Sequence, residues 1–203
     1  MKAKELSGCR LFGHFQTVID ALAPESLYPS PGGLRAVCGP VALSVEGPRL
    51  DCDELQAADE PVIWTVLEID GDRLARPVLV GFASEERRIL YGNLRSLPGI
   101  GRRSALAVLD CGENLDILRA VSGADDEFFR QVPGLGAKRI EALIANLRKS
   151  YEGALPRPLD VPVAAWVEAR DALESEGLSR SEAEEKLHGS EGSGAEEILE
   201  SIR

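Results

Sequence analysis

Apolar residues change their spacing along the chain, and this change divides the sequence into segments. The first part holds short Val-rich runs bounded by Gly, Pro and Asp, which is typical of β-strands. A long stretch with helical periodicity follows, then a proline-rich stretch, then three short helical patterns. We therefore expect a strand-rich domain at 1–83, a helical domain at 84–151, a linker at 152–162 and a three-helix domain at 163–203.

In the first segment the predicted strands are 36–45, 61–69 and 77–82. Asp70–Gly71, between the last two, is typical of a hairpin turn. Several short strands with such turns favour a small barrel or sandwich. The run at 10–24 also has helical spacing, and the sequence leaves its structure open.

The later segments carry helix signals. Ser84 followed by Glu85 and Glu86 predicts an N-cap with acidic residues in the first turn. In the last segment, 188–194 reads as a flexible turn between helices. The apolar positions expected to form its core are Trp166, Val167, Leu173, Leu178, Leu187, Ile198, Leu199 and Ile202.

The helical segment contains an internal repeat. Residues 97–109 are echoed by 132–144, at a constant offset of 35 residues. Each copy reads apolar–Pro–Gly–apolar–Gly, has a basic residue two positions on, and continues as a helical pattern. The glycines permit a tight turn between helices. We expect the apolar residue between them, Ile100 or Leu135, to point inward and the next helix to begin at the second glycine.

This arrangement suits an anion. The first N–H groups of a helix have no acceptor within it, and the helix dipole favours negative charge there. Basic residues in the first turn can reach the same phosphates, and such contacts carry no base information. These basic residues are Arg102, Arg103, Lys138 and Arg139. A single copy is also typical of an ordinary helix turn, but two copies predict a tandem helix-hairpin-helix that binds DNA without sequence preference.

The charge distribution limits where DNA can bind. The formal net charge is −11, which opposes binding to phosphates. Residues 85–150, however, hold 11 Lys and Arg against 9 Asp and Glu, whereas 1–84 hold 7 against 12 and 159–203 hold 4 against 12. We therefore expect any contact with a polyanion in the middle segment.

Several chemistries are disfavoured. The four cysteines form no CxxC pair and the two histidines are isolated, so we expect no metal, no cofactor and a thiol-reducing cytoplasm. The chain has no G-x-x-x-x-G-K-[ST] motif, so an ATPase would be another protein. A nuclease or ligase is disfavoured because neither a carboxylate cluster at metal-ligand spacing nor a nucleophilic lysine motif is present. No apolar run approaches the length of a membrane helix.

The run GFASEERRILYGNLRSLPGIGRRSALAVL, followed by VPGLGAKRIEALIANLRKSY, resembles the RuvA family of Holliday-junction branch-migration proteins. The resemblance is specific over about 78–151 and rests on architecture elsewhere. It implies an α+β chain with an OB-like β-barrel, a tandem helix-hairpin-helix domain, and a three-helix (UBA-like) domain that contacts the AAA+ motor RuvB. It also implies a bacterial homotetramer that holds a four-way junction on a basic face.

The resemblance assigns DNA contacts to both turns. Arg103 takes the place of a family lysine, and Ala137 stands where a second lysine is common, so one phosphate contact is missing. The residues expected at DNA are Gly99, Ile100, Gly101, Arg102, Arg103, Gly134, Leu135, Gly136, Lys138 and Arg139.

Relatives also carry an acidic pin on a β-turn, and the turn at 69–77 is the nearest match. Its candidates are Glu68, Asp70 and Asp72, although the turn is longer than the family's and a solvated acidic hairpin is the plain alternative. The candidates for contact with the motor are Val167, Leu173 and Leu178. We expect Trp64 and Trp166 to be core residues rather than platforms for base stacking.

Two functions remain. The first is a DNA-binding subunit that holds four-way junctions, recruits a motor and has no catalytic site of its own. The second is an adaptor that keeps the fold but has lost junction binding. The net charge of −11, Ala137 and the weakly matched first segment favour the adaptor to some degree.

Overall fold

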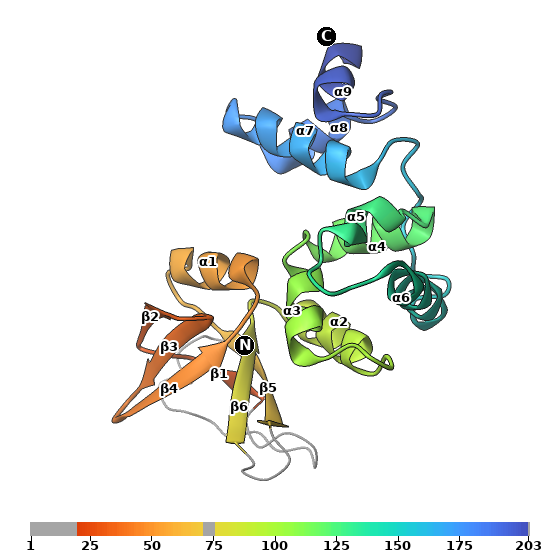
Figure 1. Ribbon diagram of the computed structural model, residues 1–203. Coiled ribbons are helices and arrows are strands. Elements are labelled where there is room, and N and C mark those ends of the chain that lie inside the picture. Colours follow the sequence, from red (N-terminus) through yellow and green to blue (C-terminus); the bar gives the residue numbers. More distant parts are fainter. Residues whose placement is uncertain (1–19, 71–75, 203) are drawn as a thin grey trace. The chain divides into compact units, whose positions relative to one another are not determined.

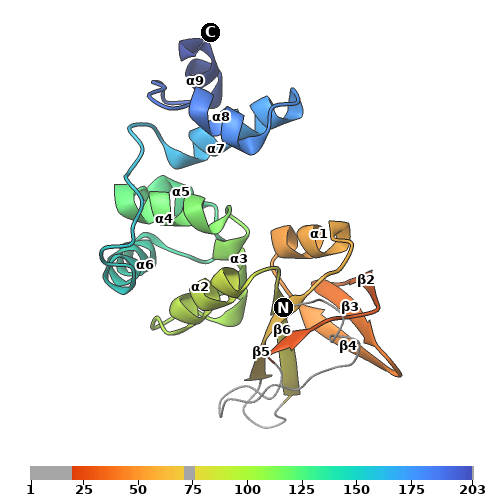
Figure 2. The same ribbon diagram turned by 180° about the vertical axis from the view of Figure 1, so that it is seen from behind.

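The computed structural model describes residues 20–70 and 76–202, and the chain divides between Gly92 and Asn93 into two compact units (Figures 1 and 2). The first unit is a sheet with a helix packed on it, and it includes most of α2. Its elements are β1 (Ala21–Leu22), β2 (Ser26–Ser30), β3 (Gly33–Cys38), β4 (Val41–Glu46), α1 (Arg49–Ala57), β5 (Ile63–Asp70), β6 (Arg76–Phe82) and α2 (Glu85–Arg95).

The sheet has the strand order β1-β5-β6-β4-β3-β2, and all neighbours are antiparallel except β4 and β6. The predicted strand at 36–45 is two strands, because Gly39 takes a positive φ of 57° and turns β3 into β4. The predicted hairpin is confirmed: β5 pairs with β6 from Trp64↔Phe82 to Asp70↔Arg76. Within the described residues the sheet is open, with β1 and β2 at its edges.

Three elements of the first unit were missed by sequence analysis. The undecided run at 10–24 lies mostly outside the described residues, and its described end contains the short strand β1. Strand β2 contains Pro29 and pairs along β3. Helix α1 is short and mostly polar, and only Asp51, Cys52 and Leu55 are buried. Cys52 and Leu55 join the apolar core beneath the sheet.

A buried ion pair holds α1 in place. Asp51 is 1% exposed, and Arg87 donates to it from Nε at 3.1 Å and from Nη2 at 2.9 Å. The backbone N–H of Ala83 also donates to Asp51, at 2.9 Å. These bonds tie the first turn of α1 to α2 and to the connection that precedes it, so an acidic residue is part of the buried interior here.

The second unit is helical throughout its described length. Its elements after α2 are α3 (Arg102–Leu109), α4 (Asn114–Gly123), α5 (Asp126–Arg130), α6 (Ala137–Ser150), α7 (Val163–Ser175), α8 (Arg180–Lys186) and α9 (Ala195–Ser201). The helical prediction for 84–151 and the three-helix prediction after 163 are therefore confirmed. No helix in the described part of the chain is both long and apolar enough to span a membrane.

The last three helices share the core that the sequence predicted. Trp166, Leu173, Leu187 and Ile198 are buried, and the other four predicted positions pack against them half-buried. The predicted turn at 188–194 connects α8 to α9. Residues 155–162 form neither helix nor strand, as expected for a linker, but Leu159 and Val161 pack against this same core.

Candidate nucleic-acid interface

The first repeat forms a hairpin turn between α2 and α3. The N–H of Ile100 donates to the carbonyl of Leu97 at 3.1 Å, and Gly99 takes a φ of 81°, which favours glycine. Ile100 is 4% exposed, so the predicted inward anchor is confirmed. Gly101 is the N-cap of α3 and has no side chain that caps the helix.

The second repeat forms the same turn between α5 and α6. The N–H of Leu135 donates to the carbonyl of Val132 at 3.2 Å, and Gly134 takes a φ of 77°. Leu135 is 6% exposed. Gly136 is the N-cap of α6, again without a capping side chain. The repeat in sequence is therefore a repeat in structure.

The two glycines of each turn have different roles. Gly99 and Gly134 are required by their own backbone, because their φ angles are positive. Gly101 and Gly136 have ordinary φ angles of −84° and −75°. A methyl group added at either would meet no non-neighbouring heavy atom within 4 Å. Nothing in the fold excludes a side chain at Gly101 or Gly136, so their openness suits a ligand that approaches the backbone closely.

The predicted basic residues lie at these openings. Arg103, Lys138 and Arg139 are exposed and Arg102 is half-buried. Arg139 lies close to both turns: its Nη1 donates to the carbonyl of Gly134 at 3.4 Å, and its Nε lies 3.5 Å from the position of a Cβ on Gly99. Ala137, where the family has a further lysine, is exposed and brings no charge.

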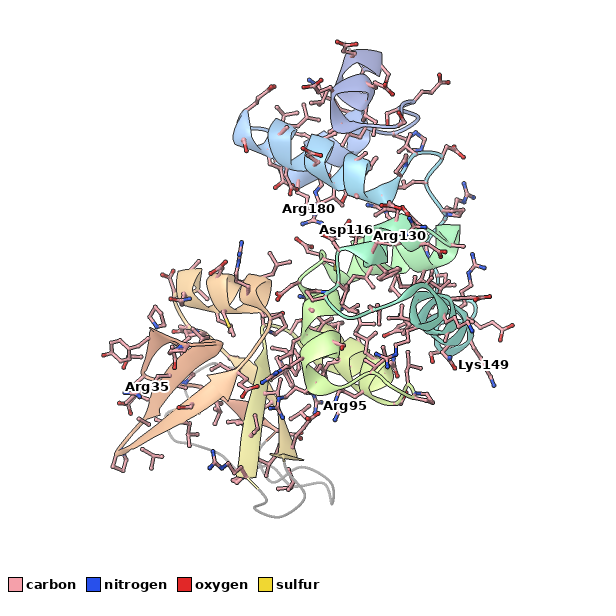
Figure 3. All side chains as sticks on the ribbon, viewed as in Figure 1. Arg35, Arg95, Asp116, Arg130, Lys149 and Arg180 are labelled. Carbon is pink, nitrogen blue, oxygen red and sulfur yellow. The ribbon has the colours of Figure 1, made fainter. Side chains whose placement is uncertain are left out.

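Sequence analysis missed three residues whose hydrogen bonds stabilise the hairpin region, one of them at a turn itself. Arg95, in the last turn of α2, donates from Nη1 to the carbonyl of Ile100 at 2.8 Å (Figure 3). Arg148 of α6 donates to the carbonyls of Val121 and Ser122 at the end of α4, at 2.9 and 2.6 Å. A basic residue near a helix C-terminus is the available signal for both.

The third is Asn93 in α2, which is bonded to Tyr151 at the end of α6. Its Nδ2 donates to the hydroxyl of Tyr151 at 3.0 Å. Burial raises the pKa of Tyr151, and the bond from Asn93 partly opposes that rise. The Asn93–Tyr151 bond therefore joins α2 to the C-terminal end of α6.

The acidic-pin candidates are only partly described. Glu68 accepts a hydrogen bond from the hydroxyl of Tyr91 at 2.7 Å. Asp70 is the last residue of β5, and Asp72 lies outside the described residues. The pin therefore stays a prediction.

The candidates for contact with a partner lie in the three-helix domain. Leu173 is 5% exposed within its core, and Val167 and Leu178 are half-buried against that core. Of the tryptophans, Trp166 is buried, as predicted. Trp64 is half-buried, with the guanidinium of Arg88 at 5.5 Å from its ring.

Comparison with known proteins fits this geometry. A family model described as a SAM-like helix-hairpin-helix tandem matches residues 91–149, which contain both turns. The subunit RuvA of the Holliday junction branch migration complex from Rubrobacter xylanophilus is 32% identical over 175 residues, covering 84% of this chain and 88% of the relative. The chain belongs to the RuvA family. RuvA of Laribacter hongkongensis is also 32% identical, over 183 residues, covering 84% and 89%.

The family relationship extends well beyond the hairpins. RuvA of Limosilactobacillus fermentum is 31% identical over 183 residues, and the match covers 86% of each chain. These matches are longer than the 59 residues of the tandem model, so the RuvA relationship includes sequence on at least one side of the two turns.

Proposed function

We propose that this chain is the DNA-binding subunit of a branch-migration complex, which holds Holliday (four-way) junctions and recruits the AAA+ motor RuvB. The observation that carries the proposal is the pair of equivalent hairpin turns. Each presents an uncapped helix N-terminus, an open glycine and basic side chains. Such a pair grips phosphates at two points and is indifferent to base sequence.

The proposed DNA contacts are those of the two turns, from Gly99 to Arg103 and from Gly134 to Arg139, with Ala137 contributing no charge. Phosphate contacts position a duplex, so discrimination between a junction and linear DNA must come from the assembly rather than from one hairpin. We therefore propose a homotetramer, in which repeated hairpins lie on one basic face. The acidic pin near 68–72 belongs to this proposal as the element facing the junction centre.

The remaining domains fit a division of labour. In this proposal 1–83 form an OB-like barrel that supports assembly, 84–151 hold DNA, and 152–162 connect to a UBA-like domain at 163–203. That last domain contacts the motor through Val167, Leu173 and Leu178. The chain has no catalytic site in this scheme, and its sequence has no Walker A motif, so ATP hydrolysis belongs to the motor. The setting we propose is the bacterial cytoplasm.

A gel-shift titration with a synthetic four-way junction and a linear duplex of the same length tests junction binding. We expect the junction to be bound more tightly, with affinity falling steeply as salt rises. Equal and weak binding to both would overturn the proposal and would favour the adaptor that has lost junction binding.

The motor contact is tested separately, with a chain ending at Tyr151. This chain should still bind junctions but should fail to stimulate branch migration by RuvB. Stimulation equal to that of the full chain would show that residues after Tyr151 do not serve the motor.

A further inference from the structure

The sheet of the first unit carries a tyrosine and an arginine side by side on its outer face. On β3 the two neighbours of Arg35, Leu34 and Ala36, are buried in the core, so Arg35 lies on the opposite face. The register pairs Arg35 with Tyr28 of β2 on one side and with Ser44 of β4 on the other. Because directly opposed residues of antiparallel strands share a face, these three side chains form one row across the strands.

Tyr28 differs from the other tyrosines of the described chain in its exposure. It is 54% exposed, whereas Tyr91 is 1% exposed and Tyr151 is half-buried. Arg35 is exposed as well and extends from β3 into solvent (Figure 3). Among the residues that the structure describes, no carboxylate forms an ion pair with Arg35. The row therefore offers an aromatic ring and a cation whose Cβ atoms are about 5 Å apart.

The side chains around this pair are mostly small. The strand positions that share its face are held by Ser26 and Ser30 of β2, Gly33 and Val37 of β3, and Ala42, Ser44 and Glu46 of β4. Of these, Val37 and the carboxylate of Glu46 are half-buried. Apart from Arg35, no long and exposed side chain at these positions obstructs a planar group that approaches the Tyr28 ring. We call these positions, together with Tyr28 and Arg35, the Tyr28–Arg35 face.

The chemistry of this face suits an unpaired nucleotide better than a protein strand. Within the described residues β2 is an edge strand, and its Pro29 has no N–H to donate, which is a common way for an edge to resist the addition of another strand. A base, in contrast, stacks on an aromatic ring, and a guanidinium binds phosphate. The bases of a duplex are already paired and stacked on one another, so the face requires a single strand.

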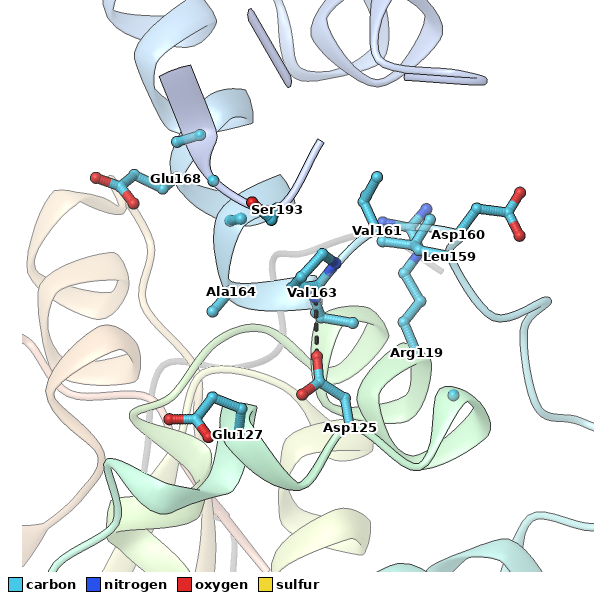
Figure 4. A pocket seen from close by; sticks show the side chains of 15 residues that line it. Arg119, Asp125, Glu127, Leu159, Asp160, Val161, Val163, Ala164, Glu168 and Ser193 are labelled. Carbon is cyan, nitrogen blue, oxygen red and sulfur yellow. Dashed lines mark hydrogen bonds between the residues drawn. The ribbon is translucent and has the colours of Figure 1, made fainter. Parts of the chain in front are cut away.

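A cavity in the second unit is a less suitable place for a nucleic acid. It has a volume of about 560 Å³, and four carboxylates line it against one arginine, Arg119 (Figure 4). These carboxylates belong to Asp125, Glu127, Asp160 and Glu168. Their negative charge disfavours phosphate.

We propose that the Tyr28–Arg35 face binds single-stranded DNA, with one base stacked on the Tyr28 ring and a neighbouring phosphate bound by the Arg35 guanidinium. The site lies in the first unit and shares no residue with the two hairpin turns. It goes beyond the proposed function, because the hairpins bind phosphates whether or not the bases are paired, whereas this face selects an exposed base. The inference does not depend on junction binding.

Photo-crosslinking of the full chain to a short oligodeoxythymidylate that carries one 5-iodouracil tests the stack directly. Long-wavelength ultraviolet light breaks the carbon–iodine bond, and C5 of the uracil bonds to an aromatic ring stacked on it, with loss of hydrogen iodide. Trypsin releases Tyr28 in the peptide 11–35, which contains no other tyrosine. We expect mass spectrometry to find the adduct at Tyr28, and an excess of unmodified oligodeoxythymidylate to suppress it.

Fluorescence anisotropy with a labelled oligodeoxythymidylate measures the affinity. Tyr28→Ala should weaken binding on the order of 10-fold, because one stacked base is lost. Tyr28→Phe keeps the ring and is the matched control, so it should bind like the parent. Arg35→Ala should flatten the slope of log affinity against log salt by about 0.7, the contribution of one phosphate on a single strand. Because both side chains are exposed, we expect all three variants to unfold in urea at the midpoint of the parent.

The double variant Gly101→Val with Gly136→Val separates this site from the hairpins. It should lose affinity for junctions and keep the adduct at Tyr28, so a failure of the hairpin proposal would leave this result unchanged. A parent chain with no adduct at Tyr28 would overturn the inference, and so would equal affinities of Tyr28→Ala and Tyr28→Phe. A change of oligomeric mass in Tyr28→Ala, with no adduct in the parent, would also overturn it and would identify the face as an interface between copies of this chain.

Discussion

The two hairpin turns share one backbone but are supported by different arginines. In the first, Arg95 precedes the turn and bonds to Ile100 at 2.8 Å. In the second, Arg139 follows the turn, makes a longer bond of 3.4 Å to Gly134 and also lies against Gly99. The first turn thus has an arginine of its own, whereas Arg139 is shared by both.

The difference teaches that a sequence repeat can preserve an anion site while changing its cations. Both turns present a glycine N-cap and an open approach. The first has Arg102 and Arg103 in the first turn of its helix. The second has Lys138 and Arg139, with the neutral Ala137 at the position that corresponds to Arg102. We infer equal backbone sites whose cations stand at different positions of the first helical turn.

The largest predicted effect on junction binding comes from blocking the open backbone at the two N-cap glycines. Gly101→Val and Gly136→Val should each weaken junction binding roughly 10- to 100-fold, because charge-assisted hydrogen bonds to phosphate are lost. The fold should persist, since both positions are open. Gly194→Val is the matched control, because Gly194 is also an open N-cap glycine, at α9. Parent-like binding by both hairpin variants would mean that no phosphate approaches these glycines.

The second largest effect concerns the basic side chains at the turns, which are tested by the salt dependence of DNA affinity. Each neutralised phosphate contributes about −0.9 to the slope of log affinity against log salt on duplex DNA. Arg103→Ala with Lys138→Ala should flatten that slope by roughly two and weaken binding to every sequence alike. Arg130→Ala is the control, because Arg130 is exposed, is paired with Glu127 within α5 and lies outside both copies of the repeat. An unchanged slope in the double variant would remove the hairpins from the DNA surface.

Because Arg95 and Arg139 bond to their turns with different strength, removing each of them should change the stability of the fold by a different amount. Arg95→Ala should lower the free energy of unfolding by about 1–3 kcal/mol, since it leaves the partly buried carbonyl of Ile100 without this charged donor. Arg139→Ala should cost less than about 1 kcal/mol, because its bond is long and exposed. Urea unfolding of the two variants measures both values. A larger loss in Arg139→Ala would reverse the comparison.

The hairpins were predictable from sequence because their determinants are local. Two glycines, a proline and an inward apolar residue within five positions specify each turn, and the 35-residue offset repeats them. Ile100, Leu135 and the helices around them follow from that pattern. The same locality explains the correct core of the three-helix domain, where the apolar spacing on α7 is helical.

Contacts between distant charges were not predictable. Asp51 and Arg87 are 36 residues apart, and Asp116 and Arg170 are 54 apart. In sequence each acidic residue resembles a solvated surface position, and burial depends on a partner supplied by the fold. Helix α1 was missed for this reason: one of its three buried residues is Asp51. The position of the linker depends similarly on Ser122 and Asp125, which lie in the hairpin region.

The smallest predicted effect is a gain in affinity for junction DNA. Ala137→Lys places a charge in the first turn of α6, where the helix dipole disfavours it by a few tenths of a kcal/mol. It should steepen the salt slope by about 0.9 and tighten junction binding at low salt, because it adds a phosphate contact to the second hairpin. Ala154→Lys adds the same charge at an exposed position outside the repeat. If it tightens binding as much as Ala137→Lys, the gain reflects whole-chain charge rather than a new contact at the second hairpin.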